Sequence, residues 1–156
     1  MSDIPADAVI RAWTRLVRAR QRVLSAVDAE LKRAGFPPLA WYDALLELRR
    51  VGPAGLRPYQ LEAAMLLAQY NLSRLVDRLE AAGHLARAPS PVDGRGQVLT
   101  ITEPGRALLE AMWPAYAAAI GRHFGARLTE PQAAMLASLL DRLLDPPGVA
   151  PPPPRR

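Results

Sequence analysis

The sequence predicts a mainly α-helical fold with one small β-hairpin. Apolar residues recur every three or four positions over long stretches near both ends of the chain, which is the period of amphipathic helices. Between residues 85 and 102 the pattern changes to two short strand-like segments separated by a run of turn-forming residues. Half of the 156 residues are hydrophobic, which is enough to bury a core in one domain.

Three helices are predicted in the first part of the chain. The first runs from about Asp7 to Ala34 and is stopped by Gly35, because glycine commonly ends a helix. The second runs from about Leu39 to Val51 and ends at Gly52. A short third helix is predicted to begin near Pro58, since proline is tolerated in the first turn of a helix.

A fourth helix, from about Gln69 to Ala82, precedes the hairpin, and Gly83 stands where a left-handed C-cap belongs. The two strands are predicted at residues 85–88 and 97–102. Proline, glycine, serine and aspartate fill the link between them, which predicts a long exposed tip. The helix is expected to bury one stripe of apolar residues, namely Leu72, Leu75, Val76 and Leu79.

Two more helices are predicted after the hairpin. Thr102 fits the N-cap of a helix that reaches about Phe124. Thr129 and Gln132 fit a capping box that opens a last, leucine-rich helix.

The order helix, turn, helix, hairpin is that of a winged helix-turn-helix, which we assign to a lobe over residues 35–104. The flanking helical segments, residues 1–34 and 105–145, carry more apolar surface than a monomer of this length can cover. We therefore expect these N- and C-terminal helices to form the dimerisation region of a homodimer. Six of the last eleven residues, 146–156, are proline, which predicts an extended, disordered tail.

The polar face of the fourth helix is the candidate recognition surface, because the second helix of this motif enters the major groove of DNA. Asn and Gln can form paired hydrogen bonds with adenine, Arg can do so with guanine, and Ser or Tyr can contact phosphate or a base edge. The alternative is that this face is only solvated. The predicted DNA-binding residues of this helix are Gln69, Tyr70, Asn71, Ser73, Arg74 and Arg78.

Arg95 is the predicted DNA-binding residue of the hairpin tip. It stands between Gly94 and Gly96, and a narrow minor groove attracts an extended guanidinium through its negative potential. Asp93 is expected to support the wing by holding an arginine in place, either Arg95 itself or Arg87 at the base of the wing.

The formal net charge is +5 at pH 7, and the whole excess arises between Arg11 and Arg33. Four of the arginines in this stretch have the spacing of one helix face. This face is either solvated or a track for phosphates, so the net charge alone does not decide the function. The four arginines are Arg11, Arg15, Arg18 and Arg22.

Residues suited to catalysis or metal binding are scarce. The chain has no cysteine, and its two histidines, His84 and His123, are far apart in the sequence. It also lacks a phosphate-binding loop and a nucleophile elbow. We therefore expect no enzymatic activity, no cofactor and no metal site, and a small enzyme is the least favoured alternative. No long apolar run and no secretion signal is found, so we expect a cytoplasmic protein that does not insert into membranes.

Two motifs resemble the MarR family (multiple antibiotic resistance regulators). Residues 93–109 read DGRGQVLTITEPGRALL, which is similar to the family's wing signature Asp-x-Arg, three residues, Leu-x-Leu-Thr, two residues, Gly-Arg, with Ile101 as the second leucine. Residues 73–83 resemble its recognition helix. The resemblance extends from about the first helix to about Leu144. It implies a homodimeric winged-helix transcriptional regulator that binds double-stranded DNA. Such regulators are often repressors, and a small aromatic or lipophilic ligand often releases them from the DNA.

Two positions depart from the family pattern. Ala68 stands before the recognition helix, where the family often has Ser or Thr, and Arg57 stands before Pro58 in place of a small hydroxyl residue. The exact starts of both helices are therefore open.

The resemblance also implies an effector site between the dimer helices and the DNA-binding lobe. Trp13, Trp41, Tyr42 and Trp113 are the candidate ligand pocket, and plain core packing of these rings is the alternative. A second hypothesis for the whole protein is a winged-helix module that binds protein without sequence-specific DNA binding. It is favoured by the near-neutral balance of residues 57–106, which hold six basic and five acidic residues.

Overall fold

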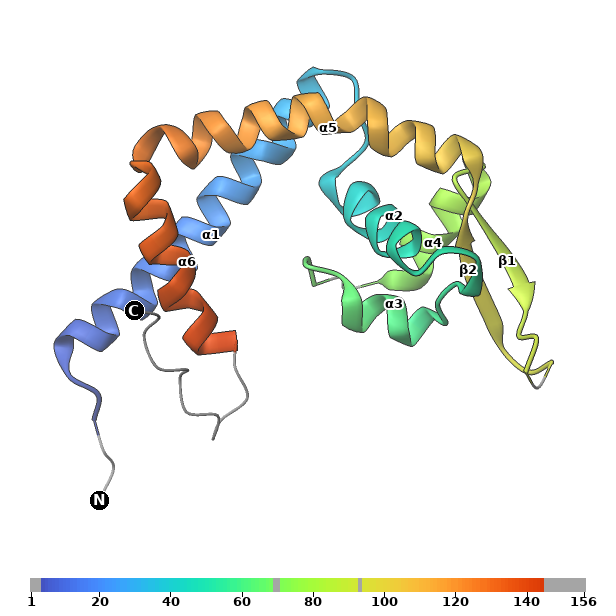
Figure 1. Cartoon of the computed structure of the whole chain (residues 1–156), viewed down its shortest axis with the longest axis horizontal. Coiled ribbons are helices and arrows are strands. Elements are labelled where there is room, and N and C mark those ends of the chain that lie inside the picture. Colours follow the sequence, from blue (N-terminus) through green and yellow to red (C-terminus); the bar gives the residue numbers. More distant parts are fainter. Residues whose placement is uncertain (1–3, 69–70, 93, 145–156) are drawn as a thin grey trace, which may run out of the picture.

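The computed structural model describes residues 4–68, 71–92 and 94–144. Figure 1 shows a bowed molecule in which α5 (Glu103–His123) links a lobe at one end to α1 (Asp7–Arg33) and α6 (Glu130–Leu144) at the other. The predicted mainly helical fold with one hairpin is confirmed. The lobe consists of α2 (Leu39–Val51), α3 (Pro58–Ala64), α4 (Leu72–Ala81), β1 (Leu85–Pro89) and β2 (Gln97–Ile101).

The first three helices lie where the sequence predicts them. α1 ends at Arg33, one residue before the predicted end, and Gly35 follows with a φ of 81°. The start of α2 depends on a contact that local sequence does not reveal. Pro38 precedes this helix and has no side-chain acceptor, and Asp28 of α1 accepts the N–H of Leu39 at 2.7 Å. α1 thus satisfies a backbone donor of the first turn of α2.

The prediction that the fourth helix begins near Gln69 is wrong in its boundary, because α4 begins at Leu72. The side chain of Asn71 accepts the N–H of Arg74 at 3.0 Å, which makes Asn71 the N-cap. An asparagine at this position satisfies a first-turn donor that the methyl group of Ala68 cannot satisfy. The helix end agrees with the prediction, since Gly83 adopts a φ of 79°.

The hairpin has an additional partner from the segment that precedes α3. β1 and β2 pair in antiparallel register over their full lengths. Leu56 joins them through a bridge to Leu99, with N–H to carbonyl distances of 3.0 and 2.8 Å. The approach requires a glycine, because Gly55 has a φ of 65° and a Cβ there would lie 2.5 Å from the Leu99 carbonyl oxygen. The segment just before α3 is therefore hydrogen-bonded to β2 of the hairpin.

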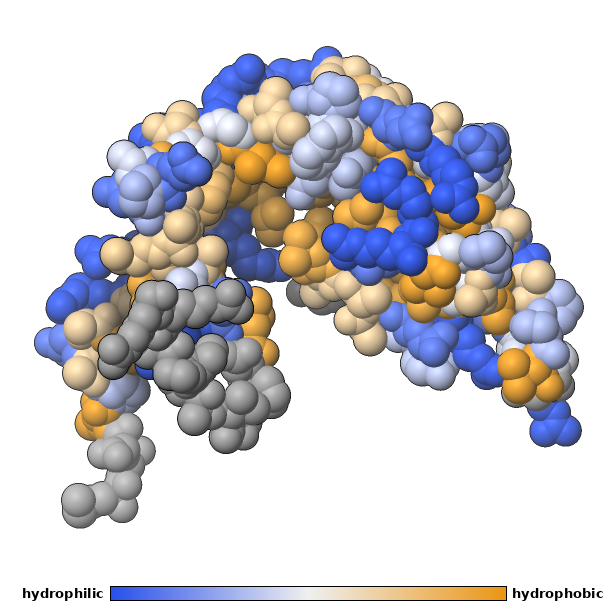
Figure 2. All heavy atoms as spheres, viewed as in Figure 1, coloured by the Kyte–Doolittle hydropathy of each residue, from blue (hydrophilic) through white to orange (hydrophobic). Residues whose placement is uncertain are grey.

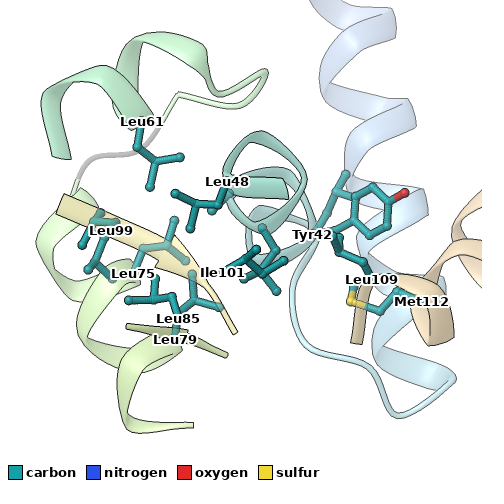
Figure 3. Packing of buried hydrophobic residues seen from close by; sticks show 14 of the residues in the cluster. Tyr42, Leu48, Leu61, Leu75, Leu79, Leu85, Leu99, Ile101, Leu109 and Met112 are labelled. Carbon is teal, nitrogen blue, oxygen red and sulfur yellow. The ribbon is translucent and has the colours of Figure 1, made fainter. Parts of the chain in front are cut away.

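The hydrophobic core fills the lobe and continues onto the inner side of α5. In Figure 3, side chains from α2, α3, α4 and both strands converge, and Leu109 and Met112 of α5 lie beside Tyr42. α1 adds Val27 and Leu31 from its C-terminal half. α4 and the hairpin therefore pack against the same hydrophobic core, which fixes their relative positions. The largest fully buried side chains are Leu31, Leu45, Leu48, Leu61, Val76, Leu79, Leu99, Leu109 and Met112.

The predicted caps of the last two helices are confirmed. Thr102 accepts the N–H of Gly105 at 3.2 Å. Before α6, Thr129 donates its N–H to the Gln132 side chain at 2.9 Å, and its hydroxyl accepts the Gln132 N–H at 3.4 Å. α6 buries none of its residues, although it is rich in leucine. Within the described ranges, no helix is long and apolar enough to cross a membrane.

Candidate nucleic-acid interface

α4 presents a polar face beside the hairpin and buries its opposite face. Leu75, Val76 and Leu79 are buried in the lobe. Four of the predicted DNA-binding residues of this helix segment, Asn71, Ser73, Arg74 and Arg78, are exposed. Gln69 and Tyr70, also predicted to bind DNA, lie outside the described residues.

Asn71 has a structural role in addition to its predicted contact with a base. Its carbonyl oxygen accepts the Arg74 N–H, so the helix cap already uses one acceptor of the side-chain amide. The amide NH₂ group and the second lone pair of the oxygen stay available for another partner. Asn71 can therefore cap α4 and contact a base edge at the same time.

The hairpin ends in an exposed tip that carries Arg95. Gly94 and Gly96 flank this residue with φ values of 63° and 75°, which glycine adopts without strain. Asp93, the predicted support of the wing, lies outside the described residues. The tip is exposed, as an arginine that enters a groove requires.

Arg87, the other predicted support residue, ties the base of the wing to α4. Its guanidinium forms an ion pair with Asp77 and a second one, at 2.8 Å, with Glu80. It also donates a hydrogen bond to the side chain of Gln97 on β2 at 3.3 Å. These contacts join β1, β2 and α4, so Arg87 fixes α4 relative to the base of the hairpin.

Sequence reasoning missed a buried carboxylate in α2. Asp43 is 6% exposed, and its two side-chain oxygens accept the N–H groups of Leu66 at 3.1 Å and Leu67 at 2.7 Å. These two residues belong to the turn that leads from α3 toward α4. An aspartate among the apolar residues of a core helix was the available signal, because a buried carboxylate requires hydrogen-bond donors.

The four aromatic residues predicted to line a ligand pocket do not meet at one place. Tyr42 stacks on Trp113 at a ring-centroid distance of 6.4 Å, and Tyr116, which was not predicted, contacts both rings. Trp41 lies against His84 instead, at 5.8 Å. Trp13 on α1 is 67% exposed. Burial raises the pKa of the Tyr42 and Tyr116 phenols above the usual value.

A cavity of about 300 Å³ lies between α1, the start of α2 and the turn before α4. None of the four predicted aromatic residues lines it. Its walls combine apolar side chains with one guanidinium and one carboxylate. The lining residues are Arg20, Leu24, Ser25, Asp28, Pro38, Leu39, Ala40, Leu67 and Ala68.

A polar network joins α1 to the end of α5. Glu30 accepts hydrogen bonds from Arg122 at 2.7 Å and contacts His123 Nε2 at 2.6 Å. The hydrogen bond from Arg122, followed by the contact with His123, lowers the pKa of the Glu30 carboxyl below its usual value. This network connects the two long helices, α1 and α5, away from the candidate interface on α4 and the hairpin.

Comparison with known proteins agrees with this geometry. The MarR family model matches residues 34–96. The HTH-type transcriptional regulator MhqR of Bacillus subtilis is 31% identical over 135 residues, which cover 86% of this chain and 90% of MhqR. The HTH-type regulator YkoM of the same organism is 31% identical over 119 residues, covering 76% of this chain and 75% of YkoM.

A solved structure gives the same result for the fold. Sco3205, a MarR family transcriptional regulator from Streptomyces coelicolor whose structure was determined in complex with DNA, superposes with a TM-score of 0.77 and 26% identity. The superposition covers 92% of this chain and 96% of Sco3205. The helix and hairpin that form the candidate interface thus occur in the arrangement of a winged-helix regulator, and the chain belongs to the MarR family of transcriptional regulators.

Proposed function

We propose that this protein binds double-stranded DNA as a homodimer and regulates transcription, as a repressor. α4 enters the major groove, and Arg95 at the wing tip enters the flanking minor groove. The observation that carries this proposal is the exposure of Asn71, Arg74 and Arg78 on α4, in the same lobe as a hairpin whose exposed tip carries Arg95 (Figure 1). Binding of DNA by Sco3205 supports the same assignment.

A homodimer is supported by apolar side chains at the end of the molecule away from the lobe. Trp13 of α1, Met135 and Leu143 of α6 are 67%, 67% and 70% exposed. Figure 2 shows hydrophobic surface among the polar residues on this side, as well as on the lobe. We assign residues 1–34 and 105–145 to the dimerisation region and residues 35–104 to the DNA-binding lobe. A two-fold dimer would place two copies of α4 on half-sites about one helical turn apart.

A small ligand is proposed to release the protein from DNA. The cavity beside α1 suits an aromatic or lipophilic acid, since Leu24 and Leu67 offer apolar walls and Arg20 can pair with a carboxylate. Leu67 and Ala68 also belong to the turn before α4. A ligand there would therefore bias the position of the recognition helix. The stacked pair Tyr42 and Trp113 is the second candidate site.

The proposed DNA binding is tested by titrating duplexes from the region upstream of the protein's own gene at two salt concentrations. Each phosphate contact should contribute about −0.9 to the slope of log affinity against log salt concentration. Arg95→Ala should weaken specific binding, while the dimer and its unfolding midpoint stay unchanged. Affinity that does not depend on salt, or equal affinity for all duplexes, would contradict the proposal. A panel of small aromatic acids added to the bound complex tests release.

The near-neutral charge of residues 57–106 favours a second candidate, a winged-helix module that binds another protein. The same titration separates the two candidates, because such a module would not discriminate between duplexes.

A further inference from the structure

Arg57 occupies the N-cap position of α3, but its side chain does not cap the helix. A guanidinium has five N–H donors and no acceptor, so it cannot receive a first-turn N–H. The end of the helix is stabilised in the opposite direction, since the Arg57 N–H donates to the side chain of Gln60 at 2.9 Å. The Arg57 side chain therefore has another role.

That side chain reaches across to the wing. Arg57 Nη2 donates to the hydroxyl of Ser90 at 3.2 Å, although 33 positions separate the two residues. Its Nη1 lies 3.7 Å from where a Cβ would stand on Gly96. Ser90 directly follows β1, and Gly96 directly precedes β2. The guanidinium thus lies against both limbs of the hairpin where they leave the strands.

Ser90 is the centre of the hydrogen bonds that shape the wing tip. It is 4% exposed, and its N–H donates to the Gly96 carbonyl at 3.1 Å. Its carbonyl accepts the Gly94 N–H at 2.9 Å, and its hydroxyl accepts the Val92 N–H at 3.4 Å. These bonds close the loop that carries Arg95. A contact that holds Ser90 therefore holds the whole tip.

We propose that Arg57 is a positioning residue for the wing, which fixes the direction in which Arg95 enters the minor groove. This inference rests on the proposed DNA binding. Arg57 links the first turn of α3 to the tip, while Leu56, its neighbour, is bonded to Leu99 of β2. The wing is thus held at both its base and its tip by one short segment before α3. A planar guanidinium suits this position better than an ammonium group, because its rigid fork can contact two limbs at once.

The test in the free protein is amide hydrogen exchange. Removing the guanidinium in Arg57→Ala should speed exchange at Ser90 and Gly94, whose N–H groups bond within the tip, and leave the amides of α2 unchanged. Ser90→Ala, which removes the hydroxyl that receives the guanidinium, should speed exchange at Gly94 in the same way. Arg33→Ala, which removes an exposed arginine of α1, is the charge-matched control. Unchanged exchange at the tip in Arg57→Ala would overturn the inference without any reference to DNA.

The test on DNA compares a preferred duplex with one whose flanking A·T pairs are replaced by G·C pairs. The wild type should prefer the first duplex by about tenfold, which is the usual effect of a base-pair change in a recognised site. Arg57→Ala should lose most of that preference and keep the wild-type salt slope. When Arg95→Ala is already present, adding Arg57→Ala should not change the preference for the A·T-flanked duplex any further. The reason is that Arg57 is proposed to act only by orienting Arg95.

Three outcomes on DNA have different meanings. A salt slope that is flatter by about 0.9 in Arg57→Ala would show that Arg57 itself contacts a phosphate, which would overturn the positioning role. A full flank preference in Arg57→Ala would also overturn it. If the wild type binds no duplex specifically, the proposed function fails instead, and the exchange experiment alone decides whether Arg57 orders the wing.

Discussion

At the scale of single residues, Asn71 shows how one side chain can serve both the helix and its surface. Its oxygen accepts the Arg74 N–H at the start of α4, which begins at Leu72, while Asn71 itself is exposed. The cap and a base contact make different demands, because the cap needs only an acceptor and adenine needs a donor as well. Substitutions can therefore separate the two roles.

Asn71→Ser keeps a capping acceptor but loses the amide donor. We expect an unfolding midpoint in urea close to that of the wild type, with specific DNA affinity lower by about 1–3 kcal/mol. Asn71→Ala should lose the cap as well and cost about 1 kcal/mol of stability. Urea unfolding and duplex titration measure the two effects, and a non-specific duplex is the control. Equal losses on the specific and the non-specific duplex would show that Asn71 reads no base.

Residue-scale features differ in how far the sequence predicts them. The caps at Thr102 and Thr129 were predictable, because their partners lie three residues away. The contacts of Asp43 with Leu66 and Leu67, and of Arg57 with Ser90, were not. Only the packing of α2, α3 and the hairpin brings these residues together, so no local pattern contains the contact.

At the scale of elements, periodicity located the helices, and the first turn of α4 is where it failed. The apolar stripe continues correctly through Leu75, Val76 and Leu79, but it does not specify which polar residue caps the helix. The four aromatic residues predicted to line one ligand pocket lie apart for a related reason. Composition supplied the rings, whereas helix packing determines that Trp41 meets His84 and that Trp113 meets Tyr42.

The junction of α5 with the hairpin gives a prediction about packing. A Cβ on Gly105 would collide with the carbonyl oxygen of His84, which is backbone and cannot move away cheaply. Gly105→Ala should therefore destabilise the protein by about 1–3 kcal/mol. Gly121→Ala in the same helix is the matched control, because no atom lies within 4 Å of the added methyl group. It should be neutral or stabilise by up to about 1 kcal/mol. Equal effects in thermal unfolding would contradict the close contact.

The contact of α1 with α5 gives a prediction about pH. The pKa of Glu30 is lowered in the folded state, chiefly by the hydrogen bond from Arg122, relative to its usual value of 4.5. The stabilisation it brings is therefore complete above that value and is lost as the pH falls through the lower folded pKa. Glu30→Gln should be less stable than the wild type at neutral pH, and the difference in unfolding midpoint should shrink as the pH is lowered below 4.5.

Arg122→Ala removes the main cause of the lowered Glu30 pKa. Like Glu30→Gln, this variant should lose less of its unfolding midpoint than the wild type does when the pH is lowered. A constant difference between the wild type and Glu30→Gln across the acid range would contradict this assignment.

At the scale of the whole molecule, the fold separates a well-packed lobe from helices whose apolar faces stay uncovered. The lobe holds most of the core, whereas α6 buries no residue and the first half of α1 buries none. The sequence indicates the excess of apolar residues in the helices near both ends of the chain, from which we expect a dimerisation region there. α5 follows a bowed path (Figure 1), and Pro114 inside this helix is a local cause that the sequence contains, because a proline there removes a helix hydrogen bond.

The uncovered faces give the last prediction, which concerns assembly. If α6 packs against a second copy of the chain, a charge at Leu143, which is 70% exposed in the single chain, would be buried without a partner. Leu143→Glu should therefore shift the protein toward monomers in sedimentation equilibrium and make DNA binding depend steeply on protein concentration, because only a dimer spans both half-sites. Val51→Glu alters an exposed apolar residue at the end of α2, outside the proposed interface, and should leave the assembly as it is. A wild-type protein that sediments as a monomer at the concentrations where it binds DNA would contradict the dimer. Leu143→Glu with unchanged assembly would instead place the interface away from the end of α6.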